Sequence, residues 1–397
     1  MDAKQEATQN GASTPEAVQP GQAKKSSRRS FLKAGATAAG VATLGFPMIS
    51  RGAGNTVLKM QGSWGSGDIL EDYAHQYVDI VNDMGKGAGL KIDYFSAGAV
   101  VKPFEVQDAV NKGVLDMGHL VAAYWYGKNR AASLFGTGPC YGWDGTMFLS
   151  WFYYGGGRQM YLDLVQKKLG LNIVGWYLMP MPTQPLGWFK KEPKTADDLK
   201  NLKYRTVGLA ANVMQEMGCK VTQLPGGEII PAMEKGVIDA FEYNNPTSDR
   251  RFGAADVAKI YMLSSYHQPN EALEIEINKT KWDALPKEQQ SILEHSVMAA
   301  NSRNILTAYE QYPKDLQDLI HKDNVKVYHT SESILKAQLG AWDRVVAKYD
   351  QEVPEFKQIS DHQRAWAKNA AYYELLNRAD IKLAYDHYFG KELPLGF

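Results

Sequence analysis

Two charged residues at the ends of predicted strands are the strongest candidates for binding chemistry. The stretch 203–243 reads as strand, helix, strand, helix, strand, with Arg205 at the end of the first strand and Glu242 at the end of the last. In open α/β sheets, ligands bind beyond the carboxyl ends of the strands. A guanidinium stays charged at any working pH and can bind a carboxylate through two parallel hydrogen bonds. Arg205, which directly precedes a predicted helix N-terminus, therefore predicts a site for a small anion.

Glu242 raises an electrostatic problem at such a site. A carboxylate beside an anionic ligand repels it, and a dry cleft magnifies the repulsion. Either Glu242 is protonated, or it faces away, or a cation lies between the two. The amide oxygens of Gln184 and Gln268 and the backbone carbonyl of Tyr243 suit a cation, because an all-oxygen shell favours Na⁺ or Ca²⁺ over Zn²⁺. The residues alone leave the three alternatives open.

The elements around these residues predict an α/β fold with two lobes. The chain has 397 residues, which is large for a single core. Residues 57–120 read as a β-α-β-α-β unit with parallel strands, and residues 203–243 repeat that design. The segments 110–116 and 233–239 match, and each carries a glycine, Gly113 or Gly236, that is expected to end a helix in the left-handed conformation.

The flanking segments complete the predicted organisation. Residues 171–190 read as a strand, a turn that carries Thr183 and Gln184, and a returning strand. Residues 272–279 alternate as a further strand, with Gln268 in the turn before it. We expect 1–53 to be a leader and signal peptide, 54–180 to form mainly lobe 1 and 181–285 mainly lobe 2. The remainder, 286–397, is expected to be helical and to pack on the lobes or on a second subunit.

The N-terminal segment indicates export. Residues 27–33, SRRSFLK, resemble a twin-arginine signal, and the apolar run 34–46 that follows is too short and too rich in Gly and Ala to span a membrane. We expect cleavage near residues 50–53 and a mature protein in the periplasm. Many cofactor-loaded oxidoreductases use this route, so an exported enzyme acting on a small organic acid is an alternative.

Composition removes several other classes of function. Lys plus Arg equals Asp plus Glu at 44 each, so no excess charge points to nucleic acid or an anionic membrane. The two cysteines, Cys140 and Cys219, are too few for a disulfide framework; we expect two buried thiols, with a single bridge as the alternative. The chain has no HExxH or G-x-S-x-G motif, and the isolated His119 is expected to be structural.

Several longer motifs resemble one known family. They are MQGSW at 60–64, AAYWYGK at 122–128, WFYYGGG at 151–157, YRTVGLAANVMQEMG at 204–218, EKGVIDAFEY at 234–243 and ALEIEINKTKWDALP at 272–286. In this order they resemble the extracytoplasmic solute receptors of TRAP (tripartite ATP-independent periplasmic) transporters, the DctP-like family, over essentially the whole mature chain. The resemblance implies a two-lobed, periplasmic-binding-protein-like fold with a hinge and a helical C-terminal extension.

The pattern of Gln184, Glu242-Tyr243 and Gln268 is most similar to the 2-oxo acid and lactate receptors of that family, in which a metal ion bridges protein and ligand. Carried over, Arg205 would hold the carboxylate, and Gln184 would touch both ligand and metal. Glu242, the Tyr243 carbonyl and Gln268 would complete the metal shell. The family often has Trp where this chain has Tyr243, but a backbone oxygen makes that contact.

The resemblance also implies the remaining site and the function. Tyr124 would hydrogen-bond the ligand, and Trp64 and Asn212 would line the pocket or serve packing. The expected function is a receptor, not an enzyme, that captures a monocarboxylate such as pyruvate or lactate with Na⁺ or Ca²⁺ and delivers it to membrane permease subunits. A receptor for another carboxylate is an alternative, and some relatives form homodimers through their C-terminal helices.

Overall fold

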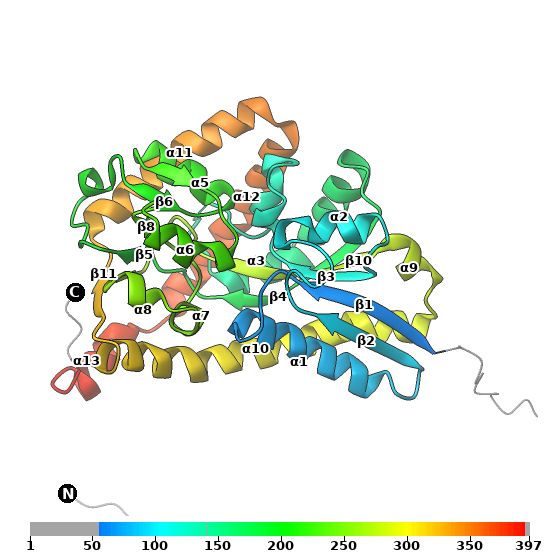
Figure 1. Cartoon of the computed structure of the whole chain (residues 1–397). Coiled ribbons are helices and arrows are strands. Elements are labelled where there is room, and N and C mark those ends of the chain that lie inside the picture. Colours follow the sequence, from blue (N-terminus) through cyan, green and yellow to red (C-terminus); the bar gives the residue numbers. More distant parts are fainter. Residues whose placement is uncertain (1–54, 140, 394–397) are drawn as a thin grey trace, which may run out of the picture. The chain divides into compact units, whose positions relative to one another are not determined.

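The computed structural model describes residues 55–139 and 141–393, which contain two β-sheets surrounded by helices (Figure 1). The twin-arginine segment, its cleavage site and Cys140 lie outside the described residues. Within them, Cys219 is a buried free thiol whose Sγ lies 3.2 Å from the Leu199 carbonyl oxygen. No helix in these two ranges is long and apolar enough to cross a membrane.

The first sheet contains the predicted N-terminal β-α-β-α-β unit. Its strand order is β2-β1-β3-β10-β4, where β1 is parallel to both β2 and β3, and β10 is antiparallel to β3 and β4. The strands are β1 (Thr56–Gly62), β2 (Leu90–Phe95), β3 (Met117–Leu120), β4 (Ile173–Met181) and β10 (Glu271–Asn278). Helix α1 (Ile69–Met84) connects β1 to β2, and α2 (Val106–Asn111) connects β2 to β3.

The second sheet contains the repeated unit. Its order is β11-β9-β5-β8-β6-β7, with β6 parallel to β7 and β8. The strands are β5 (Gly187–Phe189), β6 (Lys203–Arg205), β7 (Lys220–Thr222), β8 (Ala240–Phe241), β9 (Ile260–Leu263) and β11 (Lys326–His329). Helices α5 (Gly208–Glu216) and α6 (Ile229–Glu234) make the connections. Gly113 and Gly236 have φ values of 74° and 68°, the left-handed conformation expected after these helices.

Two expectations about the connections were wrong. Strand β5 does not return beside β4; the chain crosses from the first sheet to the second between them, and β5 pairs with β8 and β9. The segment 286–397 is not helical throughout, because β11 pairs with β9 as the edge strand of the second sheet. Strand β10, which lies within 181–285, belongs to the first sheet, so the chain passes between the sheets more than once (Figure 1).

The C-terminal helices pack across both sheets. Helix α10 (Lys287–His321) contacts α1 and β4 beside the first sheet and α7 (Pro246–Arg251) beside the second, and α11 (Glu332–Glu352) packs on α5 (Figure 1). The other helices are α3 (Gly145–Tyr154), α4 (Gly157–Leu162), α8 (Ala254–Val257), α9 (Lys279–Ala284), α12 (Pro354–Asn377) and α13 (Ile381–Phe389). Short 3₁₀ turns occur at Pro103–Glu105, Ala122–Tyr124, Arg130–Phe135, Ala196–Leu199 and Gly226–Glu228, and a π-helical turn at Asp163–Lys168.

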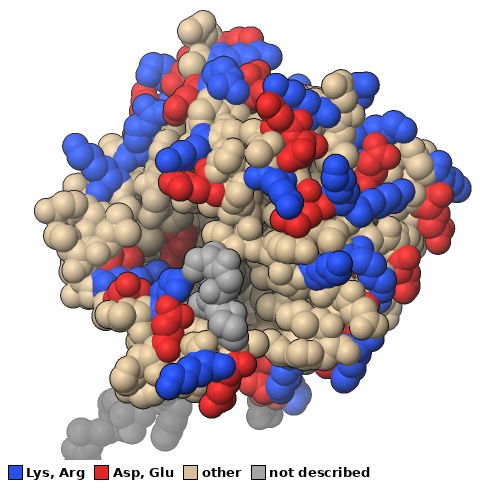
Figure 2. Space-filling model, turned by 90° about the vertical axis from the view of Figure 1, so that its left-hand side faces the viewer, with Lys and Arg blue, Asp and Glu red and all other residues tan. Residues whose placement is uncertain are grey.

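The surface agrees with the balanced composition. In Figure 2, basic and acidic side chains are interspersed over the face that is turned to the viewer, without a broad area of one sign. Such a surface lacks the electrostatic footprint of a nucleic-acid-binding protein on this face.

Strand β10 buries two carboxyl groups on one face of the first sheet. Glu274 accepts hydrogen bonds from Tyr161 Oη at 2.5 Å and Trp125 Nε1 at 2.9 Å, and Glu276 accepts one from Gln107 Nε2 at 2.7 Å. Burial and the neighbouring Glu274 carboxylate raise the pKa of Glu276 well above its usual value. Above the usual glutamate pKa of 4.5, Glu276 therefore retains a proton in the folded protein that it releases in the unfolded chain.

This pair predicts a specific pH dependence of stability. Above the usual glutamate value of 4.5, the folded state binds more protons than the unfolded state, so the free energy of unfolding falls as pH rises toward the raised pKa. Glu276→Gln keeps a neutral, hydrogen-bonding side chain and should flatten this dependence. Denaturant unfolding at several pH values should show that the free energy of unfolding of the variant rises relative to that of the wild type as pH increases. Parallel pH dependences of the two proteins would contradict the prediction. Glu310→Gln, on an exposed helix face, is the control.

Candidate functional site

The structure brings Arg205 and Glu242 into direct contact. Strands β6 and β8 are parallel neighbours in which Arg205 pairs with Phe241, so Glu242 follows at the same sheet edge. Arg205 Nη1 lies 2.8 Å from Glu242 Oε1, and each side chain is 1% exposed. Burial raises the pKa of Glu242 to about 7, although Arg205 acts to lower it. A direct ion pair is an arrangement that our three alternatives for Glu242 did not include.

The other donors of Arg205 bind backbone oxygens. Nη1 also donates to the Glu242 carbonyl at 2.9 Å, while Nε and Nη2 both donate to the Leu224 carbonyl at 2.9 and 2.7 Å. The Nε–Nη2 edge of the guanidinium, which can bind a carboxylate through two parallel hydrogen bonds, is therefore occupied by a single peptide oxygen. A ligand that binds Arg205 at this edge must displace that carbonyl, which lies in the loop between β7 and α6.

Three buried oxygens at the predicted cation ligands have no hydrogen-bond partner. They are Gln184 Oε1, Gln268 Oε1 and Glu242 Oε2. The two glutamine segments are joined by a hydrogen bond from the Gln184 N–H to the Gln268 carbonyl at 3.1 Å. Buried polar atoms are normally paired, so unpaired oxygens on these side chains fit a missing partner such as a hard cation. Within residues 55–139 and 141–393, no group of three His, Cys, Asp or Glu side chains could hold a metal, so such an ion would depend on amide and backbone oxygens beside Glu242.

A second carboxyl group, Glu271, belongs to this cluster and was missed from the sequence. It is 3% exposed and accepts hydrogen bonds from the amides of both Gln184 and Gln268. Burial raises the pKa of Glu271 to about 8, and the charge of Glu242 adds to this shift. Its position at the start of a strand, three residues after Gln268, is the only signal that the sequence offered.

The charges of the cluster act on Tyr124, whereas the hydrogen bonds of Asn212 go to other residues. Burial raises the pKa of the Tyr124 hydroxyl. The charge of Arg205 opposes this shift, and the charges of Glu271 and Glu242 add to it. The Trp64 ring lies 6.1 Å from the Tyr124 ring. Asn212, one turn into α5, accepts a hydrogen bond from Tyr126 and donates one to Gln215. The roles of all these residues stay predictions.

His119 lies beside Trp64, at a ring-centroid distance of 5.0 Å. Burial lowers its pKa to about 3, so the imidazole is neutral at physiological pH. A neutral, fully buried ring packed on an indole fits the structural role that we expected.

Asp68 connects the first lobe to this site. It caps the N-terminus of α1, and its carboxylate accepts hydrogen bonds from Tyr243 Oη at 2.5 Å and Ser248 Oγ at 2.6 Å, which both follow β8 of the second sheet. The Tyr243 ring in turn lies 5.9 Å from the Arg205 guanidinium carbon. These hydrogen bonds join the two lobes, so they can form only when the lobes are closed around the site.

Removal of the Tyr243 hydroxyl should weaken ligand binding without removing any predicted cation ligand. Tyr243→Phe keeps the backbone carbonyl and the ring but loses the bond to Asp68. A hydrogen bond to a charged group contributes about 1.5–3 kcal/mol, so we expect carboxylate affinity to fall by about tenfold or more in calorimetry. Tyr141→Phe, which loses a hydroxyl bonded to Ser360 instead, is the control. Equal affinities of the two variants would argue against a role in closure.

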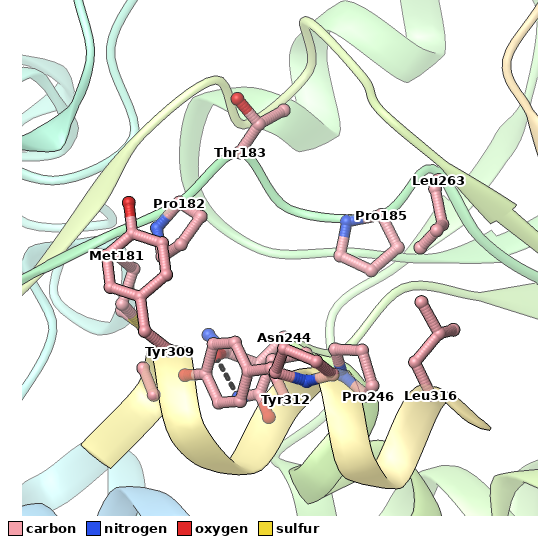
Figure 3. A pocket seen from close by; sticks show the side chains of 13 residues that line it. Met181, Pro182, Thr183, Pro185, Asn244, Pro246, Leu263, Tyr309, Tyr312 and Leu316 are labelled. Carbon is pink, nitrogen blue, oxygen red and sulfur yellow. Dashed lines mark hydrogen bonds between the residues drawn. The ribbon is translucent and has the colours of Figure 1, made fainter. Parts of the chain in front are cut away.

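A cavity of about 290 Å³ (Figure 3) is lined by none of Gln184, Gln268, Arg205, Glu242 and Glu271. Its walls include Thr183 and Pro185, on either side of Gln184, and the α10 side chains Tyr309, Tyr312 and Leu316. Figure 3 shows Leu316 across the space from Pro185. The lining is mainly apolar and contains no Arg or Lys. A small carboxylate would find no counter-charge there, whereas Arg205 provides one in the cluster.

Residues 60–352 match the family model described as bacterial extracellular solute-binding protein, family 7 (DctP). This chain belongs to that family. A relative from Nostoc sp., the monocarboxylate 2-oxoacid-binding periplasmic protein, is 31% identical over 299 residues, which cover 75% of this chain and 79% of the relative. The receptor class expected from the sequence motifs is thus confirmed.

Solved structures of TRAP solute-binding proteins share the two-lobed fold. One from Bordetella bronchiseptica, a mixed-occupancy dimer with co-purified calcium and picolinate, has a TM-score of 0.78 at 27% identity and covers 85% of this chain and 97% of its own. One from Pseudoalteromonas atlantica, with bound sodium and pyruvate, has a TM-score of 0.76 at 27% identity over 84% of this chain and 99% of its own. One from Colwellia psychrerythraea holds calcium and pyruvate, with a TM-score of 0.77 at 27% identity, over 84% of this chain and 100% of its own.

Proposed function

We propose that this family 7 receptor binds a 2-oxo monocarboxylate such as pyruvate, or a 2-hydroxy acid such as lactate, together with Na⁺ or Ca²⁺. The observation that supports this most strongly is the set of three unpartnered buried oxygens on Gln184, Gln268 and Glu242, of which Glu242 is paired with the Arg205 guanidinium. The relatives that hold pyruvate with sodium or calcium agree with this ligand class.

The charges of the site favour a cation and an acid bound together. A bound cation would supply the second positive charge that a ligand carboxylate and Glu242 jointly require. Arg205 neutralises one of the two carboxylates, and Gln184, Gln268 and the Tyr243 carbonyl would offer oxygens to the ion. The Tyr124 hydroxyl would donate a hydrogen bond to the ligand. Pairing all charges in this way avoids an unmatched ion in a dry cleft.

The residues around the site also support release and delivery. The Leu224 carbonyl accepts hydrogen bonds from Arg205 Nε and Nη2. In the empty receptor, these donors of the buried guanidinium would therefore still have a partner. Opening of the lobes would break the hydrogen bonds of Asp68 to Tyr243 and Ser248 and free the ligand.

We propose that the protein is exported through its twin-arginine segment, works in the periplasm as a receptor rather than an enzyme, and delivers the acid to TRAP permease subunits.

A homodimer would explain the exposed apolar side chains at the C-terminal end. The last turns of α12 and helix α13 expose Tyr372, Tyr373, Leu375, Leu376, Ile381, Leu383, Tyr388 and Phe389, each by half or more. Large exposed apolar patches mark interaction surfaces, and the relative from Bordetella bronchiseptica is described as a dimer. We expect the full chain to sediment as a dimer and Leu375→Glu/Leu376→Glu to sediment as a monomer; a monomeric wild type would contradict this.

The ligand assignment is tested by native mass spectrometry of protein purified without refolding. We expect the mass of the chain plus one small carboxylic acid and one Na⁺ or Ca²⁺. Recovery of the acid with no cation, or of a dicarboxylate or a zwitterionic solute, would reject the proposed ligand class.

A further inference from the structure

Glu271 holds two glutamine side chains from one side. Its Oε2 accepts hydrogen bonds from Gln184 Nε2 at 2.5 Å and from Gln268 Nε2 at 3.3 Å. The same two glutamines carry the buried Oε1 atoms that lack partners. One carboxyl oxygen is thus in contact with the nitrogen end of both amides, while both oxygen ends point elsewhere.

This contact selects one of the two orientations that each amide can adopt. An amide offers donors on its nitrogen and acceptors on its oxygen, and the two atoms diverge from the same carbon. Rotation of either amide by half a turn would set its oxygen against Glu271 Oε2, acceptor against acceptor. The selection holds for the carboxylate and for an acid that is protonated on Oε1, because Oε2 is then only an acceptor.

Thr137 fixes Glu271 in turn. Thr137 Oγ1 donates to Glu271 Oε1 at 3.3 Å and accepts from Gln268 Nε2 at 3.1 Å, and the threonine is fully buried. The four side chains therefore form a closed, buried network in which each amide nitrogen has an acceptor. Networks of this kind behind metal ligands fix the orientation of the ligating atoms and tune affinity.

We propose that Glu271 is a positioning residue, which orients the amide oxygens of Gln184 and Gln268 toward one cation position between the lobes. This inference rests on the proposed function, because it takes those oxygens as ligands of the ion. It assigns Glu271 no contact with the ion or with the acid. Its contribution is an acceptor at Oε2, so a neutral side chain with an oxygen at that place should replace it.

The test is calorimetric titration of Ca²⁺ into metal-stripped, ligand-free protein, with thermal unfolding measured in parallel. Glu271→Met fills similar space without an acceptor, and we expect Ca²⁺ affinity to fall by about 10- to 100-fold. Glu271→Gln can present its amide oxygen to both glutamines and its nitrogen to Thr137, and should remain within about threefold of the wild type. Glu276→Met, on the same strand but away from the glutamines, controls for loss of stability.

The outcomes separate this inference from the proposed function. Two results would overturn the positioning role but leave the receptor assignment intact, provided that the wild type binds Ca²⁺. The first is an unchanged Ca²⁺ affinity in Glu271→Met, and the second is an equal loss of Ca²⁺ affinity in the Met and Gln variants. Absence of Ca²⁺ and Na⁺ binding by the wild type, with or without pyruvate, would overturn both. If Glu271→Met does not fold, Thr137→Val should still lower Ca²⁺ affinity by about 2- to 10-fold, and an unchanged value would count against the network.

Discussion

Replacement of Arg205 by alanine is expected to abolish pyruvate binding. The variant would leave Glu242 buried with no counter-charge, and an arriving carboxylate would meet a like charge in a site where neither is hydrated. Loss of one partner of a buried charge pair between protein and ligand weakens binding by about 2–5 kcal/mol, which corresponds to a fall in affinity of about 30-fold or more. Calorimetry of pyruvate in the presence of Ca²⁺ measures the loss directly.

The same substitution should also lower thermal stability, so the binding result needs a folded control. Arg205→Lys keeps a positive charge but loses the planar fork that contacts Glu242 and Leu224 together. We expect it to fold and to bind pyruvate with an intermediate affinity. Micromolar pyruvate affinity in Arg205→Ala would refute the role of the guanidinium.

Glu242→Gln is expected to weaken cation and acid binding together. Glu242 is the one anionic member of the proposed oxygen shell, and its Oε2 is among the unpartnered buried oxygens. Loss of that charge should lower Ca²⁺ affinity by at least about tenfold, because charged oxygen ligands set the affinity of such sites. Because binding free energies are reciprocally linked, pyruvate affinity measured with Ca²⁺ should fall as well.

Titration of each ligand in the absence and presence of the other measures both effects. The control is Glu234→Gln, an exposed glutamate near the end of α6. Pyruvate affinity that matches the wild type in Glu242→Gln would show that the acid does not depend on an ion held by this carboxylate.

The sequence located the charged centre because that part of the problem is local. Arg205 and Glu242 each follow a short strand in a repeated β-α-β pattern, and the sheet edge brings such residues together regardless of the rest of the fold. The direct ion pair between them was not predicted. The ion pair depends on the rotamers of two buried side chains and on the position of the Leu224 carbonyl. The sequence pattern does not predict any of these.

Glu271 was missed for a related reason. Its partners Thr137, Gln184 and Gln268 come from three separate segments, and only the crossings between the sheets bring them together. The same crossings separate β4 from β5, although the local pattern favours a returning strand. Strand β11 is four residues long and lies at a sheet edge, where few contacts constrain its sequence.

Linked titration can establish whether Arg205 and a bound cation together neutralise the acid and Glu242. Pyruvate is titrated calorimetrically into metal-stripped protein in sodium-free buffer, and again after addition of Ca²⁺ or Na⁺. We expect the cation to raise pyruvate affinity by at least about tenfold, and pyruvate to raise cation affinity by the same factor. Equal pyruvate affinity with and without the cations would contradict it.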